Sequence, residues 1–142
     1  VVGVPATHGV ILDFFKKLTE DPKTLEVLGD GSQKKSYLHA SELVNAMLYV
    51  STLKARNSKI EIVNIGCSDS GIFVKDIAEI VRDIIAPSAN IVFGEADRGW
   101  LGDVPRFFYN TDKLKLLGWE PRLSSREAVA FAAEEIYRTQ FK

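Results

Sequence analysis

Apolar residues recur at helical spacing in several stretches of the chain. The stretch 73–85 is the clearest, because one stripe of aliphatic side chains runs along it and Pro87 ends it. The same spacing predicts a helix over 9–19 and another over 41–54, the latter capped by Ser41. The apolar face expected for the 41–54 helix consists of Leu43, Val44, Met47 and Leu48.

Two further helices are marked by the residues at their ends. Thr111 is placed to cap a short helix, and Gly118 is placed to end it in a left-handed conformation. Ser124, followed three residues later by Glu127, forms a capping-box pattern. This pattern predicts a final helix that reaches about Arg138.

Short apolar runs between the helices predict strands. The runs 25–28 and 91–93 are short, and 35–39 is expected to be a second strand or an extended piece. The run 60–66 is rich in β-branched residues and is expected to be a well-buried strand. Helices and strands alternate without an internal repeat or a low-complexity tract. The sequence therefore predicts an α/β fold.

Composition narrows the class of protein. The chain has 142 residues, 26% of them charged and 46% hydrophobic, which suits one ordinary globular domain. A net charge of −1 gives no broad attraction to nucleic acid or to a membrane surface, so neither is expected as a partner. Cys67 is a single cysteine, which favours a reducing, cytoplasmic location. Two histidines and one cysteine without ligand spacing predict no metal site.

The loop 97–106 concentrates groups that bind polar ligands. Glycine and proline keep the loop out of helix, and its functional side chains are Arg98, Trp100, Asp103 and Arg106. An arginine suits a phosphate, and a carboxylate suits the hydroxyl groups of a ribose. The loop is therefore a candidate binding element.

Together with the turn Gly-Asp-Gly-Ser-Gln-Lys-Lys-Ser-Tyr at 29–37, this loop resembles the C-terminal part of the extended short-chain dehydrogenases. These are NAD-dependent enzymes that epimerise or dehydrate nucleotide-sugars. The resemblance covers nearly the whole chain. It implies that 1–142 is the substrate-binding portion, a small mixed α/β domain, of a Rossmann-type epimerase. Segments 1–5 and 41–66 would then attach to a dinucleotide-binding sheet whose Rossmann domain is absent from these residues.

The resemblance also implies an activity. The intact enzyme is expected to be an isomerase of carbohydrate metabolism, a 4-epimerase of a UDP-hexose that uses NAD. A nucleotide-sugar dehydratase or reductase is the alternative within the family. A non-catalytic module that binds a nucleotide or a protein is the alternative of another class. The sequence does not distinguish the sugar or the base.

The two motifs that carry catalysis in this family are not expected to function here. The nearest glycine-rich spelling starts at Gly94, but acidic residues would face the phosphates and Pro105 interrupts the helix that should follow. Tyr109 and Lys113 have the spacing of the catalytic pair, but the cap at Thr111 places Tyr109 before the helix. We therefore expect no catalytic residue and no bound NAD in this chain, and no activity without the rest of the enzyme.

The resemblance implies contacts with the nucleotide-sugar at six positions, which are Val10, Leu28, Lys35, Tyr37, Arg98 and Asp103. Lys35 and Arg98 would hold the diphosphate, Asp103 a ribose, and Leu28 would line the nucleobase pocket, while Val10 stands at a helix start that can receive a phosphate. Arg106 is the rival of Arg98. A solvated basic hairpin is the structural alternative for Lys35 and Tyr37, and a place in the core is the alternative for Leu28.

A last expectation concerns partners. If 60–65 and the preceding helix belong to a sheet whose other strands lie elsewhere, their apolar side chains lose cover. We therefore expect this chain to self-associate, as a homo-oligomer or otherwise, or to need the dinucleotide-binding half.

Overall fold

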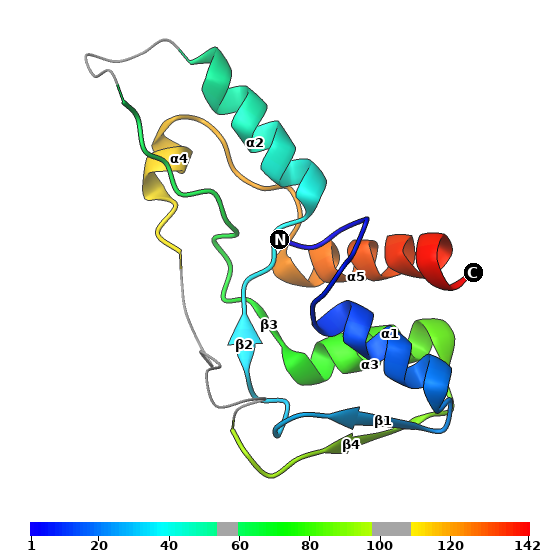
Figure 1. Cartoon of the computed structure of the whole chain (residues 1–142). Coiled ribbons are helices and arrows are strands. Elements are labelled where there is room, and N and C mark those ends of the chain that lie inside the picture. Colours follow the sequence, from blue (N-terminus) through cyan, green and yellow to red (C-terminus); the bar gives the residue numbers. More distant parts are fainter. Residues whose placement is uncertain (54–59, 98–108) are drawn as a thin grey trace.

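The computed structural model describes residues 1–53, 60–97 and 109–142, and Figure 1 shows their arrangement. The helices are α1 (Val10–Glu20), α2 (Ala40–Thr52), α3 (Val74–Ile85), α4 (Asp112–Leu116) and α5 (Ser125–Ile136), followed by a π-helical turn, η1 (Tyr137–Phe141). The strands are β1 (Thr24–Val27), β2 (Lys34–Lys35), β3 (Ile72–Phe73) and β4 (Asn90–Phe93). The α/β class is therefore confirmed.

The strands form two small sheets rather than one. β1 and β4 are parallel, in a register that runs from Thr24 opposite Asn90 to Val27 opposite Phe93. β2 and β3 are antiparallel, with Lys35 opposite Ile72. The segment 35–39, expected to be a strand or an extended piece, belongs to β2 only at Lys35 and then continues to His39, which forms an isolated parallel bridge with Val2.

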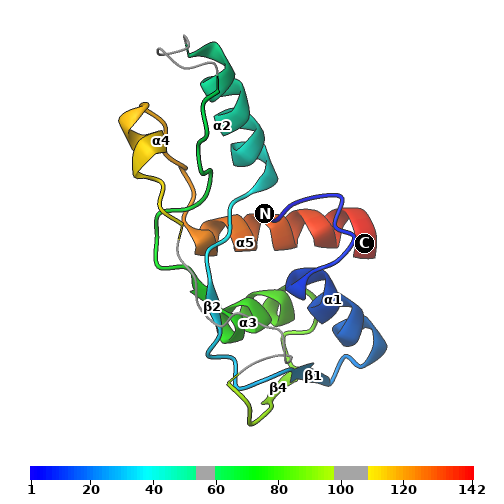
Figure 2. The same cartoon turned by 60° about the vertical axis from the view of Figure 1, so that its left-hand side comes forward.

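The main core lies between α1, α3, α5 and the β1–β4 sheet, and Figures 1 and 2 show α1 and α3 beside that sheet. Phe15 is fully buried at its centre and stacks on Phe141, with ring centroids 5.1 Å apart. A second, smaller core joins α2 to α4 through Leu38, Ala46, Cys67, Leu114 and Trp119. The amphipathic patterns that predicted the helices at 9–19 and 73–85 were correct because these two helices pack on each other and on β1.

The strand expected at 60–66 is not formed. Ile60 and Ile62 are each 76% exposed, and no strand of the described residues pairs with this segment. A β-branched run becomes a strand only when a partner strand satisfies its amides and carbonyls. The prediction of a well-buried strand is therefore wrong for this chain.

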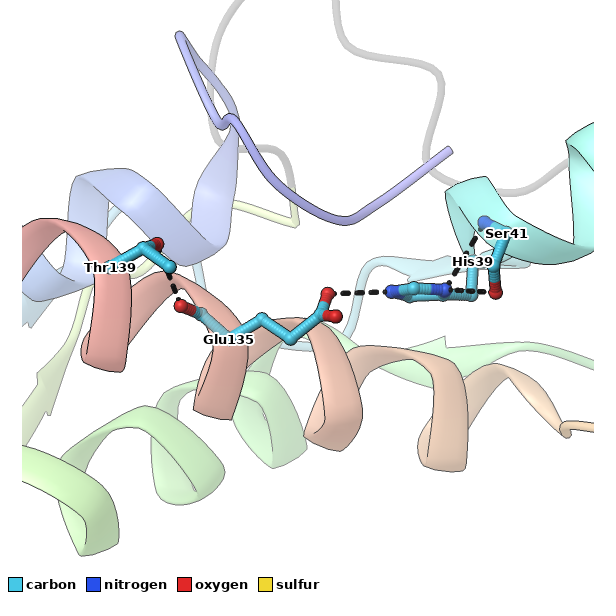
Figure 3. A network of polar contacts seen from close by, with 4 residues as sticks. All are labelled: His39, Ser41, Glu135 and Thr139. Carbon is cyan, nitrogen blue, oxygen red and sulfur yellow. Dashed lines mark hydrogen bonds and ion pairs between the residues drawn. The ribbon is translucent and has the colours of Figure 1, made fainter.

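Two expectations about α2 also need correction. Of its predicted apolar face, Leu43 packs on the second core, whereas Val44, Met47 and Leu48 are all more than half exposed. The helix begins one residue earlier than expected, and its cap is His39 rather than Ser41. Figure 3 shows the buried imidazole of His39 between Ser41 and Glu135.

His39 ties α2 to α5. Its Nδ1 accepts the Ser41 amide proton at 3.3 Å and lies 2.7 Å from Ser41 Oγ, while its Nε2 lies 3.0 Å from Glu135 Oε2. Because Nδ1 accepts a hydrogen bond from the Ser41 amide, the ring proton is on Nε2 and points to Glu135. The imidazole also packs on Phe131, with ring centroids 4.7 Å apart.

The predicted ends of the last two helices are close to the observed ones. Ser124 caps α5 in a complete capping box with Glu127. Thr111 occupies the cap position of α4, but the side chain that accepts the Asp112 amide is that of Asn110, at 3.0 Å. Gly118 ends α4 with φ 94°, the left-handed conformation that favours glycine.

Candidate functional site

A cavity of about 310 Å³ opens between α1, the end of β1, the segment 33–37 and the start of α3. Its walls are formed by Val10, Asp13, Phe14, Lys17, Val27, Leu28, Gln33, Lys35, Tyr37 and Val74. Val10, Leu28, Lys35 and Tyr37, which come from three separate segments, thus line one cavity. These four residues are the predicted ligand contacts that fall within the described part of the chain.

The turn at 29–31 brings the third of these segments across the cavity. Gly29 and Gly31 have φ values of 78° and 76°, which an L side chain rarely adopts. A Cβ on Gly31 would also come within 2.7 Å of the Phe93 ring and 2.9 Å of Lys75 Cβ. Asp30 closes the turn by accepting the Ser32 amide at 2.8 Å, and hydrogen bonds from Ser32 lower the pKa of Asp30.

Side chains alternate along the extended segment that follows the turn. Gln33, Lys35 and Tyr37 face the cavity. Lys34 points the other way, where its Nζ donates to Ser70 Oγ at 2.9 Å and lies 4.8 Å from the centre of the Phe73 ring. Two adjacent lysines therefore have different surroundings, and only Lys35 lines the cavity.

The backbone of Tyr37 is held on both sides. Its amide donates to Ser125 Oγ at 3.0 Å, and its carbonyl accepts the thiol of Cys67 at a donor–acceptor distance of 2.9 Å. Asp69 anchors Ser125, accepting its amide and its hydroxyl at 2.6 Å each. Four buried or half-buried residues from distant parts of the sequence thus fix one wall of the cavity.

Two pKa values in this network depart from their ordinary range. Burial raises the pKa of the Cys67 thiol to about 11, so the group stays protonated at neutral pH. Burial also acts to raise the pKa of Asp69, but hydrogen bonds from Ser125 and Gly71 outweigh it and hold that pKa below its ordinary value. The network therefore contains an unreactive thiol and an ionised carboxylate.

The cavity has one apolar side and one charged side. Leu28 is 63% exposed, so the prediction that it contributes only to the core does not apply. On α1, Lys17 forms an ion pair with Asp13 at 3.0 Å and donates to the Glu26 carbonyl at 3.1 Å. A neighbouring hollow of about 320 Å³ extends the site along residues 1–12 and shares Val10, Lys35 and Tyr37 with the first.

Arg98, Asp103 and the rival Arg106 lie outside the described residues. The described chain just before them is close to the cavity, because the Ala96 carbonyl accepts the Asp30 amide at 2.7 Å. The contacts expected for these three side chains remain predictions.

Tyr109 and Lys113 do not share a helix face, as the sequence predicted. Tyr109 precedes α4, and its ring packs on Gly66, where an added Cβ would come within 3.0 Å. Lys113 lies on α4, forms an ion pair with Glu61 at 2.7 Å and donates to the Ile62 carbonyl at 2.5 Å. Gly94 ends β4, where its amide donates to the carbonyls of Val27 and Gly29.

Sequence reasoning missed Gln33 as a site residue. It is 2% exposed, and neither Oε1 nor Nε2 has a hydrogen-bond partner in the described part of the chain. The signal was available, because Gln33 precedes Lys35 by two residues and therefore shares its face of an extended segment.

Comparisons with known proteins agree with this picture. Residues 3–66 match the model of the NAD dependent epimerase/dehydratase family. GDP-L-fucose synthase 1 of Arabidopsis thaliana is 31% identical in an alignment of length 108 that covers 73% of this chain and 30% of that protein. A UDP-galactose 4-epimerase structure superimposes with a TM-score of 0.81 at 33% identity, covering 99% of this chain and 44% of that one.

A further solved structure is a UDP-glucose 4-epimerase of Thermotoga maritima with UDP-glucose, with a TM-score of 0.71 at 25% identity. The match covers 95% of this chain and 41% of that one. This chain belongs to the NAD-dependent epimerase/dehydratase family. It spans less than half the length of each of these relatives.

Two further observations concern metal ions and membrane spans. Among residues 1–53, 60–97 and 109–142, no group of three or more His, Cys, Asp or Glu side chains is placed to hold a metal ion. None of the helices in those ranges has the length and apolar character needed to cross a membrane.

Proposed function

We propose that this chain is the nucleotide-sugar-binding part of an NAD-dependent sugar epimerase of the UDP-hexose 4-epimerase type. The observation that carries the proposal is the convergence of Val10, Leu28, Lys35 and Tyr37 on one cavity. The match to a UDP-galactose 4-epimerase over 99% of this chain supports the substrate class.

The chemistry of the cavity fits such a ligand. Leu28 and Val10 offer apolar surface for a nucleobase and its ribose, and Lys35 offers a cation for the diphosphate. We propose that Arg98 and Asp103 complete the site on the diphosphate and a ribose. These contacts would supply remote binding energy that orients the sugar for reaction elsewhere.

NAD does not fit the residues that the structure describes. In a dinucleotide-binding unit a strand leads through a glycine-rich turn into a helix whose N-terminus receives the pyrophosphate. Here β1 leads through the turn at 29–31 into β2, and β3 continues directly into α3. We therefore assign no NAD contact and no catalytic residue to this chain.

We further propose that residues 1–5 and 41–66 attach to a dinucleotide-binding sheet supplied by another polypeptide segment, which would hold NAD and the catalytic groups. The exposed faces of α2 and of 60–62 support this assignment. Val2 also pairs with the segment before α2, because its amide donates to Leu38 O at 2.9 Å and its carbonyl accepts the Ala40 amide at 2.8 Å.

A nucleotide-sugar dehydratase or reductase is a second candidate. It is favoured by the similarity to GDP-L-fucose synthase 1 at 31% identity and to UDP-glucuronic acid decarboxylase 1 of Arabidopsis thaliana at 30%. The binding proposal for the cavity is the same in either case. The alternative of another class is a non-catalytic module that binds a nucleotide. Turnover of a nucleotide-sugar by the complete polypeptide would distinguish an enzyme from such a module.

Calorimetric titration of the chain with UDP-glucose tests the proposal. Lys35→Ala should weaken binding by about one to two decades, because a charge-assisted hydrogen bond contributes roughly 1.5–3 kcal/mol. Lys34→Ala is the matched control and should bind as the wild type does, because its ammonium faces Ser70 and Phe73. Equal losses for both variants, or no binding by the wild type, would contradict the proposal.

A further inference from the structure

The two edges of the β1–β4 sheet differ in what covers them. On the β1 side, the outward carbonyl of Glu26 accepts the Lys17 ammonium at 3.1 Å, so a charged side chain of α1 occupies that edge. On the β4 side, Val92 and Phe93 are 51% and 41% exposed. Figure 1 shows β4 at the end of the molecule opposite α2, so this edge is distinct from the exposed apolar residues of α2 and 60–62.

The backbone groups of β4 alternate between β1 and the outer edge. The Asn90 amide donates to the carbonyl just before β1 at 2.9 Å, and the Gly94 amide donates to the last carbonyl of β1 at 3.2 Å. The even-numbered residues of β4 therefore face β1, and the amides and carbonyls of Ile91 and Phe93 point away from it. No residue in the described part of the chain pairs with these two donors and two acceptors.

The outer edge of β4 lacks the features by which proteins block strand pairing. Residues 90–94 contain no charged residue and no proline, and the register with β1 runs without a bulge. An added β-strand satisfies amides and carbonyls that point outward at every second residue. A two-stranded sheet is also only marginally stable by itself and gains stability when it widens. The edge is therefore suited to a further strand.

We propose that a second copy of this chain supplies that strand, with β4 pairing antiparallel to β4 about a twofold axis at Val92. In this register Ile91 lies opposite Phe93 of the second copy, and the two residues exchange both of their hydrogen bonds. All four outward groups of each copy are then satisfied. The result is one four-stranded sheet in the order β1, β4, β4, β1.

The charges near the edge are compatible with this pairing. Beyond the ends of the strand, Glu95 and Asp97 stand opposite two uncharged residues of the second copy, its Ala89 and Pro87. The Glu26 side chains of the two copies are three strand spacings apart, about 14 Å. An edge of four residues buries little surface, so the dimer should be weak and concentration-dependent. The pairing does not depend on whether a nucleotide binds.

Cross-linking tests the register. Val92 faces Val92 of the second copy in a non-hydrogen-bonded pair, whose Cα atoms lie about 4.5 Å apart, a distance that a disulfide can bridge. In a Met47→Lys, Ile62→Lys background, which removes the other association surface, Val92→Cys should form a disulfide-linked dimer under mild oxidation. Glu26→Cys, on the same face but one strand further from the axis, is the matched control and should stay monomeric. Cys67 does not compete, because its thiol is buried.

Proline substitution tests the hydrogen bonds. Ile91→Pro removes an amide that points away from β1, so the chain keeps its own ladder while each copy loses one donor to the other. In the same background, sedimentation should show a dimer dissociation constant that rises at least about tenfold. Thr24→Pro is the matched control, because the Thr24 amide points outward at the β1 edge. If circular dichroism shows that Ile91→Pro is unfolded, Val92→Lys repeats the test by placing two like charges at the axis.

Amide exchange followed by NMR tests the pairing without a change in β4. With rising concentration of the background variant, the amides of Ile91 and Phe93 should become protected, whereas that of Val92, which faces β1, should be protected throughout. Protection of Ile91 and Phe93 in the monomer would mean that another segment of this chain covers the edge. Fast exchange at every concentration, without cross-linking of Val92→Cys, would mean that the edge is open to a different partner. Either result overturns the pairing.

Discussion

The side chains that shape the candidate site are held by residues far away in the sequence. Tyr37 depends on Ser125 and Cys67, and Ser125 depends on Asp69. None of these partners could be identified from the sequence, because hydrogen bonds across 30 to 88 positions leave no local pattern. The alternation of Gln33, Lys35 and Tyr37, in contrast, is readable from the sequence once an extended segment is assumed.

At the scale of single residues, Cys67 should resist alkylation in the folded chain. Its pKa of about 11 leaves little thiolate at pH 8, and the thiol is buried. Mass spectrometry after treatment with iodoacetamide should show slow labelling in native buffer and complete labelling in denaturant. Fast labelling of the native chain would mean that the wall beside Tyr37 is open.

Asp69 should make stability fall in acid. Its pKa is lowered in the folded chain, so its contribution to stability is present above the unfolded pKa of about 4 and is lost as the pH falls through the folded value. Urea unfolding from pH 7 to pH 3 should show a steeper loss for the wild type than for Asp69→Asn. Parallel curves would contradict the ionised, hydrogen-bonded carboxylate.

At the scale of elements, local pattern predicted the helices that pack into this chain's own main core and failed where the expected partner is not among the described residues. α3 and α5 were readable because their stripe and capping box are local signals. The segment 60–66 has strand propensity without a partner strand in the described residues, and α2 exposes Val44, Met47 and Leu48 of its predicted apolar face. Both wrong predictions thus concern apolar side chains that have no packing partner among the described residues.

The cap of α2 yields a test at this scale. His39→Ala removes the acceptor for the Ser41 amide and the bond to Glu135 together, as Figure 3 makes clear, and should lower the free energy of unfolding by about 2–4 kcal/mol. Ser41→Ala keeps both of these bonds and should cost less. Urea denaturation of the two variants measures the difference, and equal losses would contradict the tie between α2 and α5.

At the scale of the whole molecule, several large apolar side chains of α2 and of the segment 60–62 are exposed, which is unusual for a domain that folds as a monomer. Val44, Met47, Leu48, Ile60 and Ile62 are each more than half exposed. Burial of two such side chains contributes about 3–6 kcal/mol, which is a large part of a small domain's net stability. We therefore predict that the isolated 142-residue chain self-associates through this surface.

Sedimentation velocity tests that prediction. The wild type should sediment as a concentration-dependent oligomer, and Met47→Lys with Ile62→Lys should shift it toward the monomer. Lys23→Ala, on the loop before β1, is a control that should leave the oligomer intact. A monomeric wild type whose 60–65 amides are strongly protected from hydrogen exchange would contradict the assignment of this segment to an external sheet.

The central claim is that the cavity between α1, β1 and α3 binds the nucleotide of a nucleotide-sugar. Backbone amide shifts recorded by NMR during a titration with UDP test it most directly, because they locate the ligand on the chain. The account predicts saturable shifts at Val10, Leu28, Lys35 and Tyr37, with little change at Asn45 and Trp119, which line a separate hollow. Shifts confined to α2 and α4, or none at all, would contradict it.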